Sequence, residues 1–131
     1  MNYKYKISAQ PLTSTQRREE LKFLIELLSQ MGYQSVEILF GTFWGNEYRD
    51  WTPVSIKLNE IAKEIALAET VSTGSFEEDD FFITVNELQT EVLFCHEHDM
   101  HLEYNKDNEL TSAILSHWNT TGYEVKKRVS T

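Results

Sequence analysis

The chain has 131 residues and a net charge of −9, with 40% hydrophobic and 12% aromatic residues. This length fits a single domain, and the hydrophobic content is sufficient for one core, which argues against a disordered chain. No apolar run approaches the roughly 18 residues of a membrane span, and the opening MNYKYKISAQ lacks the order of a signal peptide. The lone cysteine, Cys95, cannot form an internal disulfide, which favours a reducing, cytoplasmic location.

The negative charge is concentrated in residues 77–109, which hold eleven of the 21 acidic residues and a single basic residue, Lys106. Nucleic-acid affinity comes largely from lysine and arginine side chains that neutralise phosphates. The acidic half therefore argues against direct binding to DNA or RNA. A basic protein partner would be attracted instead.

Two predicted strands flank a predicted helix in the first 40 residues. Residues 3–9 and 33–40 alternate apolar and polar side chains, the period of a strand with one buried face. Between them, apolar residues recur at three- and four-residue spacing up to Met31, which predicts an amphipathic helix. Thr13 and Gln16 have the spacing of a capping box at its start.

The charged residues of this helix lie mostly off its apolar stripe, so most of them are expected to face solvent. They are Arg17, Arg18, Glu19, Glu20 and Glu26. Gly32 is expected to cap the helix, since glycine adopts the left-handed conformation without a Cβ penalty.

Residues 41–53, GTFWGNEYRDWTP, predict an irregular loop rich in aromatic side chains. Tryptophan, tyrosine and arginine dominate the energetic hot spots of protein interfaces. We expect Phe43 and one tryptophan to close an end of the core, and the other large side chains to recognise a partner. The candidate partner-binding residues of this loop are Trp44, Tyr48, Arg49 and Trp51.

Residues 58–68 carry a helical apolar stripe, and the segment that follows, VSTGSFEEDD, predicts an exposed loop. Its four consecutive acids could attract a basic partner, and they lack the alternate-position spacing of a calcium loop. These candidate partner-binding residues are Glu77, Glu78, Asp79 and Asp80.

The last part of the chain predicts a hairpin, a helix and a strand. Residues 81–85 and 90–96 are apolar runs separated by four residues, a spacing that suits a hairpin. Asn108 can cap a third helix that Gly122 ends, and residues 123–129 suggest a final strand.

The order strand, helix, Gly-Tyr, strand occurs at residues 3–40 and again at residues 90–129. Two such units predict a split βαβ arrangement, the ferredoxin-like two-layer α+β sandwich, with an inserted helix and hairpin strand. An irregular α+β mixed sheet is the alternative.

The segment CHEHDMH holds the cysteine and three of the four histidines. On a strand, His96 and His98 would point to the same side, and imidazole, thiolate and carboxylate groups are usual zinc ligands. The candidate metal ligands are His96, His98, Asp99 and His101, with Cys95 or His117 completing the shell.

The competing interpretation has no cofactor: histidines and carboxylates pair with one another at the surface. Cys95 beside His96 is a poor nucleophile pair, because neighbours on a strand point to opposite faces. A buried small side chain is the expected role of Cys95.

The leading functional hypothesis is a non-enzymatic acidic protein-binding module that engages a basic partner, as an immunity or inhibitor protein of bacterial type would. The first alternative is a metal-binding protein or metal-dependent hydrolase centred on CHEHDMH, with zinc activating a water. The second is a homo-oligomeric domain that binds a small ligand. No phosphate-binding glycine loop, G-x-S-x-G elbow or dinucleotide fingerprint occurs.

Overall fold

The computed structural model describes residues 3–10, 12–41, 44 and 52–130. Within these residues, seven strands form one sheet in the order β3-β2-β4-β5-β6-β1-β7, and every neighbouring pair is antiparallel. The strands are β1 (Tyr5–Gln10), β2 (Ser35–Phe40), β3 (Val54–Lys57), β4 (Phe81–Val85), β5 (Thr90–Phe94), β6 (Met100–Tyr104) and β7 (Glu124–Val129). The helices are α1 (Ser14–Gln30), α2 (Ile61–Val71) and α3 (Glu109–Thr121), with short 3-10 turns at Leu58–Glu60 and Asn86–Leu88.

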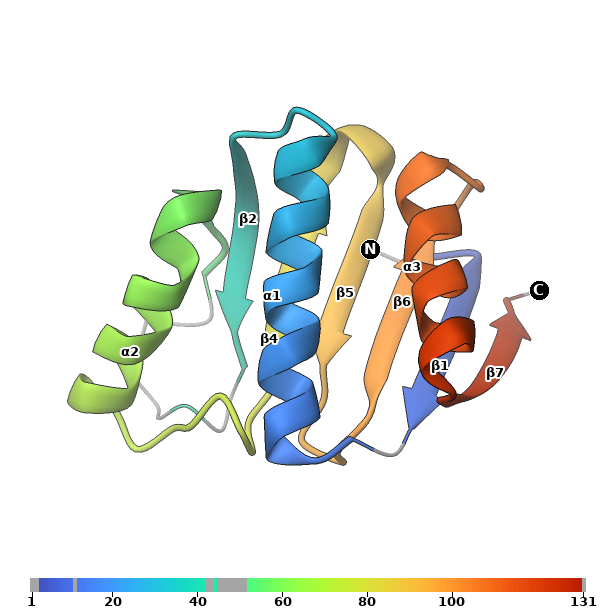
Figure 1. Cartoon of the computed structure of the whole chain (residues 1–131). Coiled ribbons are helices and arrows are strands. Elements are labelled where there is room, and N and C mark those ends of the chain that lie inside the picture. The colour runs from blue at the N-terminus through green and yellow to red at the C-terminus, as the bar shows by residue number, and fades with distance from the viewer. Residues whose placement is uncertain (1–2, 11, 42–43, 45–51, 131) are drawn as a thin grey trace.

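The three α-helices lie on one face of the sheet, with α1 across its centre and α2 and α3 on either side (Figure 1). Alternate strand residues point toward these helices, and one row of directly opposed side chains crosses five strands at 0 to 4% exposure. That row is Ile38, Ile83, Val92, Leu102 and Ile7. Burying each such side chain contributes about 1.5–3 kcal/mol, so this layer forms the core. No helix in the described ranges is long and apolar enough to cross a bilayer.

The predicted capping box of α1 is present, and Asn108, predicted to cap α3, forms a second box. Thr13 Oγ1 accepts a hydrogen bond from the Gln16 N–H at 3.1 Å, and Gln16 Oε1 accepts one from the Thr13 N–H at 2.9 Å. Asn108 caps α3 in the same reciprocal way with Thr111. The φ angles of Gly32 and Gly122 are 93° and 94°, so both glycines adopt the left-handed conformation expected after a helix.

The α+β class is confirmed, and the sheet is larger than that of a simple ferredoxin-like sandwich. The unit β6-α3-β7 is a split βαβ, because β1 lies between its two strands. In the unit β1-α1-β2, however, three strands separate β1 from β2. The ferredoxin-like topology is therefore not confirmed, and β3 and β6 go beyond the predicted strands.

Two charged residues of α1 correct the prediction that its charged side chains lie in solvent. Arg17 is 2% exposed and Glu20 is 5% exposed. Because α1 lies over the middle of the sheet, its flanks contact other elements as well. Arg17 contacts the loop before β4, and Glu20 contacts α3 and the residues that follow it.

Candidate functional site

Residues 95–99 form the tight turn between β5 and β6. The Cys95 N–H donates to the Asp99 carbonyl oxygen at 3.0 Å, and the His98 N–H donates to the Cys95 carbonyl oxygen at 3.1 Å. His98 has a φ of 65°, the left-handed conformation found in three-residue hairpin loops that end in a bulge. The strand predicted through His96 therefore ends earlier, and the prediction that His96 and His98 point to one side of a strand is wrong.

The histidines of this turn have different surroundings. His96 Nδ1 lies 2.9 Å from Asp80 Oδ1, and His101 Nε2 lies 2.8 Å from Asp99 Oδ2. His98 is exposed and belongs to neither group of potential metal ligands that the described side chains form. The geometry therefore does not bring His96, His98 and His101 together around one ion.

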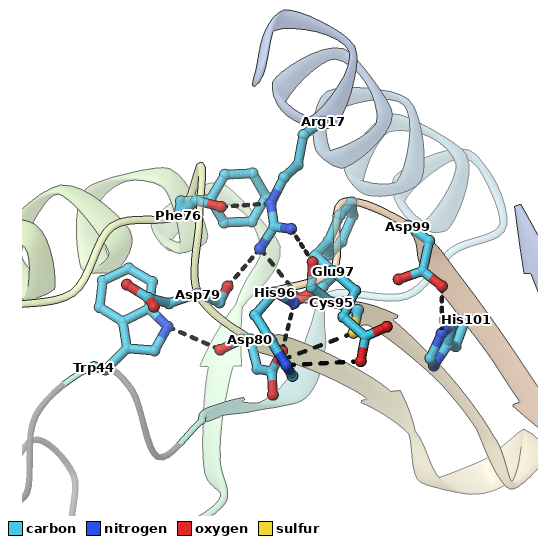
Figure 2. A network of polar contacts seen from close by, with 11 residues as sticks. Arg17, Trp44, Phe76, Asp79, Asp80, Cys95, His96, Glu97, Asp99 and His101 are labelled. Carbon is cyan, nitrogen blue, oxygen red and sulfur yellow. Dashed lines mark hydrogen bonds and ion pairs between the residues drawn. The ribbon is translucent and has the colours of Figure 1, made fainter. Parts of the chain in front are cut away.

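The two groups of potential ligands share the Cys95 thiol. One is Asp80, Cys95 and His96, the other is Cys95, Asp99 and His101, and within each group the ligand atoms lie within 4.8 Å of one another. Figure 2 shows the two groups on opposite sides of Cys95. Asp99 Oδ1 is buried and accepts no hydrogen bond from the described residues. A buried acceptor left in this way costs about 1–3 kcal/mol.

Cys95 is a protonated thiol at neutral pH. Its residue exposure is 5%, and burial raises the pKa of the thiol to about 11, with the Asp99 carboxylate adding to the effect. His96 Nδ1 lies 3.9 Å from the sulfur, but the same nitrogen is within hydrogen-bonding distance of Asp80. Because the thiolate is the nucleophilic form, this arrangement does not activate Cys95 for catalysis.

Most of the acidic loop, residues 77–80, contacts the protein itself. Three of its four carboxylates accept hydrogen bonds within the chain, whereas Glu78 is exposed. The donors are Arg18 Nε to Glu77 (2.9 Å), the Ser75 N–H to Asp79 (2.8 Å) and the His96 N–H to Asp80 (2.7 Å). The acids therefore shape the loop, and Glu78 is the member best placed to meet a partner.

Arg17 ties this loop to the hairpin turn (Figure 2). Its guanidinium donates hydrogen bonds to the main-chain carbonyls of Phe76, Asp79, Phe94 and Cys95, the last at 2.6 Å. The rings of Phe76 and Phe94 lie 5.1 and 5.9 Å from its Cζ atom. Burial lowers the pKa of Arg17 to about 10, so the side chain stays charged at neutral pH. Arg17 thus holds the hairpin turn against the loop before β4. The helical spacing of residues in the sequence did not predict this role.

Trp44 is the tryptophan that closes the core. It is 0% exposed, its indole N–H donates to the Asp80 carbonyl oxygen at 2.8 Å, and a Cβ atom on Gly74 would lie 2.5 Å from its ring. The indole therefore offers no surface to a partner. The other predicted partner-binding residues of this loop, Tyr48, Arg49 and Trp51, lie outside the described residues.

His117 belongs to a separate, partly buried cluster between α1 and α3. Glu20 Oε2 lies 2.9 Å from His117 Nε2 and accepts a hydrogen bond from the Tyr123 hydroxyl at 3.0 Å. The imidazole stacks on Phe23 with ring centroids 3.7 Å apart. Burial and the Glu20 carboxylate raise the pKa of Tyr123. His117 does not join either ligand group at the hairpin turn.

The opposite face of the sheet carries a row of acids that sequence reasoning missed. Directly opposed residues share a face, and the register places Glu37 opposite Thr84, Thr84 opposite Glu91, and Glu91 opposite Glu103. In the described structure no helix covers this face, because α1, α2 and α3 all lie on the other one (Figure 1). We call it the helix-free face. The strand period places both Glu91 and Glu103 outward, but only the hairpin register shows that they oppose each other.

An apolar row runs beside the acids on the helix-free face. Leu39 opposes Phe82, Phe82 opposes Leu93, and all three are half-buried. The β1 and β7 end of the same face is basic. Its basic side chains are Lys6, Lys126 and Arg128.

The acid row perturbs the ionisation of its own members. Burial raises the pKa of Glu91. The hydrogen bond from Thr84 lowers this pKa, and the charge of Glu103 raises it. Burial, followed by the charges of Glu91 and Glu103, raises the pKa of Tyr3 to about 12. The Tyr3 phenol therefore lies within the negative field of the row.

No known protein family, curated protein or solved structure matches this chain. The function must therefore be inferred from the geometry of the chain itself.

Proposed function

We propose that this protein is a binding module that recognises a basic segment of a partner protein with its helix-free face. The observation that carries the proposal is the direct opposition of Glu91 and Glu103 across β5 and β6. Like charges directly opposed in a sheet are destabilising. A lysine or arginine side chain between the two carboxylates would replace this repulsion with charge-assisted hydrogen bonds.

The surroundings of the acid pair suit a protein ligand. The half-buried row of Leu39, Phe82 and Leu93 provides apolar contact area next to the carboxylates. Interfaces combine such an apolar centre with charged groups that set orientation. The net charge of −9 would also steer a basic partner toward the protein. An inhibitor or immunity protein that masks a basic active site would use a surface of this kind.

A second candidate function is self-association through the same face. Lys6, Lys126 and Arg128 lie at its β1 and β7 end, so the face has an acidic part and a basic part. Two copies in opposite orientations would bring the basic end of each over the acids of the other. Such an interface would have the two-fold symmetry that is commonest among homodimers.

The proposal is tested by calorimetric titration of a deca-lysine peptide into the wild type and a Glu91→Gln/Glu103→Gln double variant. We expect the wild type to bind with an affinity that falls as salt rises, and the variant to bind about tenfold to a hundredfold more weakly. The matched control is Glu19→Gln/Glu26→Gln, which removes the same charge from exposed positions of α1. This control should keep most of the affinity.

Equal losses in the two double variants would show that affinity follows net charge and would reject the helix-free face as the site. Light scattering on the same proteins separates the two candidate functions. A wild-type dimer that dissociates when Glu91 and Glu103 are replaced would make a second copy the basic partner. A monomeric wild type would exclude self-association and leave recognition of a different protein as the function of this face.

A further inference from the structure

We propose that Cys95, Asp99 and His101 form a binding site for a divalent transition-metal ion of the zinc class. Their ligand atoms, a thiol sulfur, a carboxylate oxygen and an imidazole nitrogen, lie within 4.8 Å of one another at the end of the β5-β6 hairpin. Sulfur, nitrogen and oxygen donors in one small group are typical of zinc sites. This inference is independent of the partner-binding proposal, because it uses neither Glu91 nor Glu103.

The site is enclosed. The side chains of Asp99 and His101 are 13% and 14% exposed, and Cys95 is 5% exposed. Asp99 Oδ1 is buried and has no hydrogen bond of ordinary geometry from the described residues, and the Asp99 carboxylate interacts with the Cys95 thiol. A bound cation would satisfy that oxygen. Buried polar atoms without a partner are rare in proteins, so this oxygen is an independent indication of a ligand.

The neighbouring group of Asp80, Cys95 and His96 is a weaker candidate. Asp80 Oδ1 already accepts a hydrogen bond from the His96 N–H at 2.7 Å and lies 2.9 Å from His96 Nδ1. The His96 side chain is 42% exposed, so water competes for it. Because both groups use the same sulfur, an ion bound to Cys95 is completed by only one of them. The deeper burial of Asp99 and His101 favours that group as the binding site.

The backbone holds the ligands in place before any ion binds. The Cys95 N–H donates to the Asp99 carbonyl oxygen, and Arg17 donates to the Cys95 carbonyl oxygen. Groups fixed in this way orient metal ligands and raise affinity.

The adjustment that an ion requires is small. His101 Nε2 and Asp99 Oδ2 are now 2.8 Å apart. In tetrahedral zinc coordination, nitrogen and oxygen ligands lie about 3.3 Å apart, so a slight rotation of the two side chains makes room. Binding converts the thiol to a thiolate and releases its proton to solvent, and the neutral imidazole supplies a lone pair. Three protein ligands leave the fourth position for water.

The test uses tag-free protein stripped of metal and titrated with cobalt(II), a coloured substitute for zinc. We expect one ion per chain, a thiolate-to-cobalt charge-transfer band, and displacement of cobalt by zinc. Cys95→Ser should abolish the band, and Asp99→Asn and His101→Gln should each weaken binding by about tenfold or more. His98→Gln is the matched control and should bind like the wild type.

The His96→Gln variant decides between the two groups. Unchanged binding supports Asp99 and His101, whereas loss of binding in His96→Gln places the ion beside Asp80 and overturns the assignment. Absence of a charge-transfer band in folded wild type also overturns it. Far-ultraviolet circular dichroism checks that each variant folds. If the Asp99 or His101 variants unfold, the two single variants His96→Gln and Cys95→Ser still decide between the two groups.

Discussion

The hairpin turn held by Arg17 and the acid row on the helix-free face differ in whether their charged side chains have compensating partners. The Arg17 guanidinium is buried, and four main-chain carbonyls accept its hydrogen bonds. Glu91 and Glu103 are like charges placed directly opposite each other. The carbonyl acceptors offset the free-energy cost of burying the Arg17 charge. The repulsion between Glu91 and Glu103 adds a free-energy cost to folding.

This difference separates a charge that builds the fold from charges that are candidates for recognition. A buried cation that donates four hydrogen bonds to the main chain stabilises the segments that supply the acceptors. Glu91 accepts a hydrogen bond from Thr84 and Glu103 lies opposite Lys6 as well, but the repulsion between the two opposed carboxylates works against folding. Substitutions in the two regions should therefore change stability in opposite directions.

The largest expected effect is at Arg17. Arg17→Met keeps most of the apolar volume but removes the guanidinium that donates to four carbonyls, three of them at buried contacts, so we expect the free energy of unfolding to fall by about 3–5 kcal/mol. Urea denaturation measures it. The control is Arg18→Met, since Arg18 is 48% exposed and pairs with Glu69 and Glu77 at the surface. Exposed ion pairs contribute about 0–1 kcal/mol, so similar losses in the two variants would contradict the role of Arg17 in holding the turn.

Glu20 tests whether a buried carboxylate that accepts hydrogen bonds stabilises the fold as the buried Arg17 does. Its Oε2 atom is close to both His117 and the Tyr123 hydroxyl. Glu20→Gln should lower the free energy of unfolding by about 1–3 kcal/mol, because hydrogen bonds to a charged acceptor are replaced by weaker ones. Thermal denaturation beside Glu19→Gln, an exposed neighbour on the same helix, provides the comparison. A stable Glu20→Gln protein would show that this cluster does not support the fold.

Glu91→Gln should have the opposite sign and stabilise the protein by up to about 1 kcal/mol at pH 7. The pKa of Glu91 is raised in the folded protein, chiefly by burial, so ionisation above that pKa costs stability. The wild type should recover this cost as the pH falls through the raised pKa. The advantage of the variant should therefore vanish below the ordinary glutamate pKa of about 4.3. Denaturant unfolding at several pH values measures the difference, and a destabilised variant at pH 7 would contradict it.

The smallest expected effect is at His98, within the turn that Arg17 holds. Its φ of 65° is a conformation that glycine adopts without steric cost. His98→Gly should raise the free energy of unfolding by about 0.5 kcal/mol, the relief of strain offset in part by the entropy of glycine. Glu97→Gly is the control at a neighbouring position without positive φ and should destabilise the protein. The reverse order of the two stabilities would show that the turn is not strained at His98.

Helices and their ends could be predicted from the sequence because the signals are local. The capping box of Thr13 and Gln16 depends on residues three positions apart, and Gly122 follows directly on the helix that it ends. The turn at residues 95–99 could not be predicted, because it contains no glycine or asparagine and its histidines alternate as strand residues do. Its left-handed position is filled by His98, whose carbonyl oxygen accepts a hydrogen bond from the Leu12 N–H at 3.0 Å.

The site depends on contacts between distant residues, so the sequence gives little indication of it. Arg17 lies four residues before Leu21 and so continues the apolar face of the helix, but its acceptors lie about 60 to 80 positions further along the chain and cannot be read from that spacing. The opposition of Glu91 and Glu103 depends on the hairpin register, which a change of one residue in the turn would alter. Composition predicted an acidic surface, but not the face that carries its opposed acids.

The Arg17 side chain also determines how the molecule opens. Its guanidinium joins the first turn of α1 to the loop before β4 and to the end of β5, so none of these segments can separate without breaking bonds to the same group. They therefore form one cooperative unit in native-state hydrogen exchange, with amides in the loop and in the hairpin turn exchanging through a shared opening. A local fluctuation of the loop thus becomes a fluctuation of the hairpin end, which contains the Cys95 thiol shared by both groups of potential metal ligands.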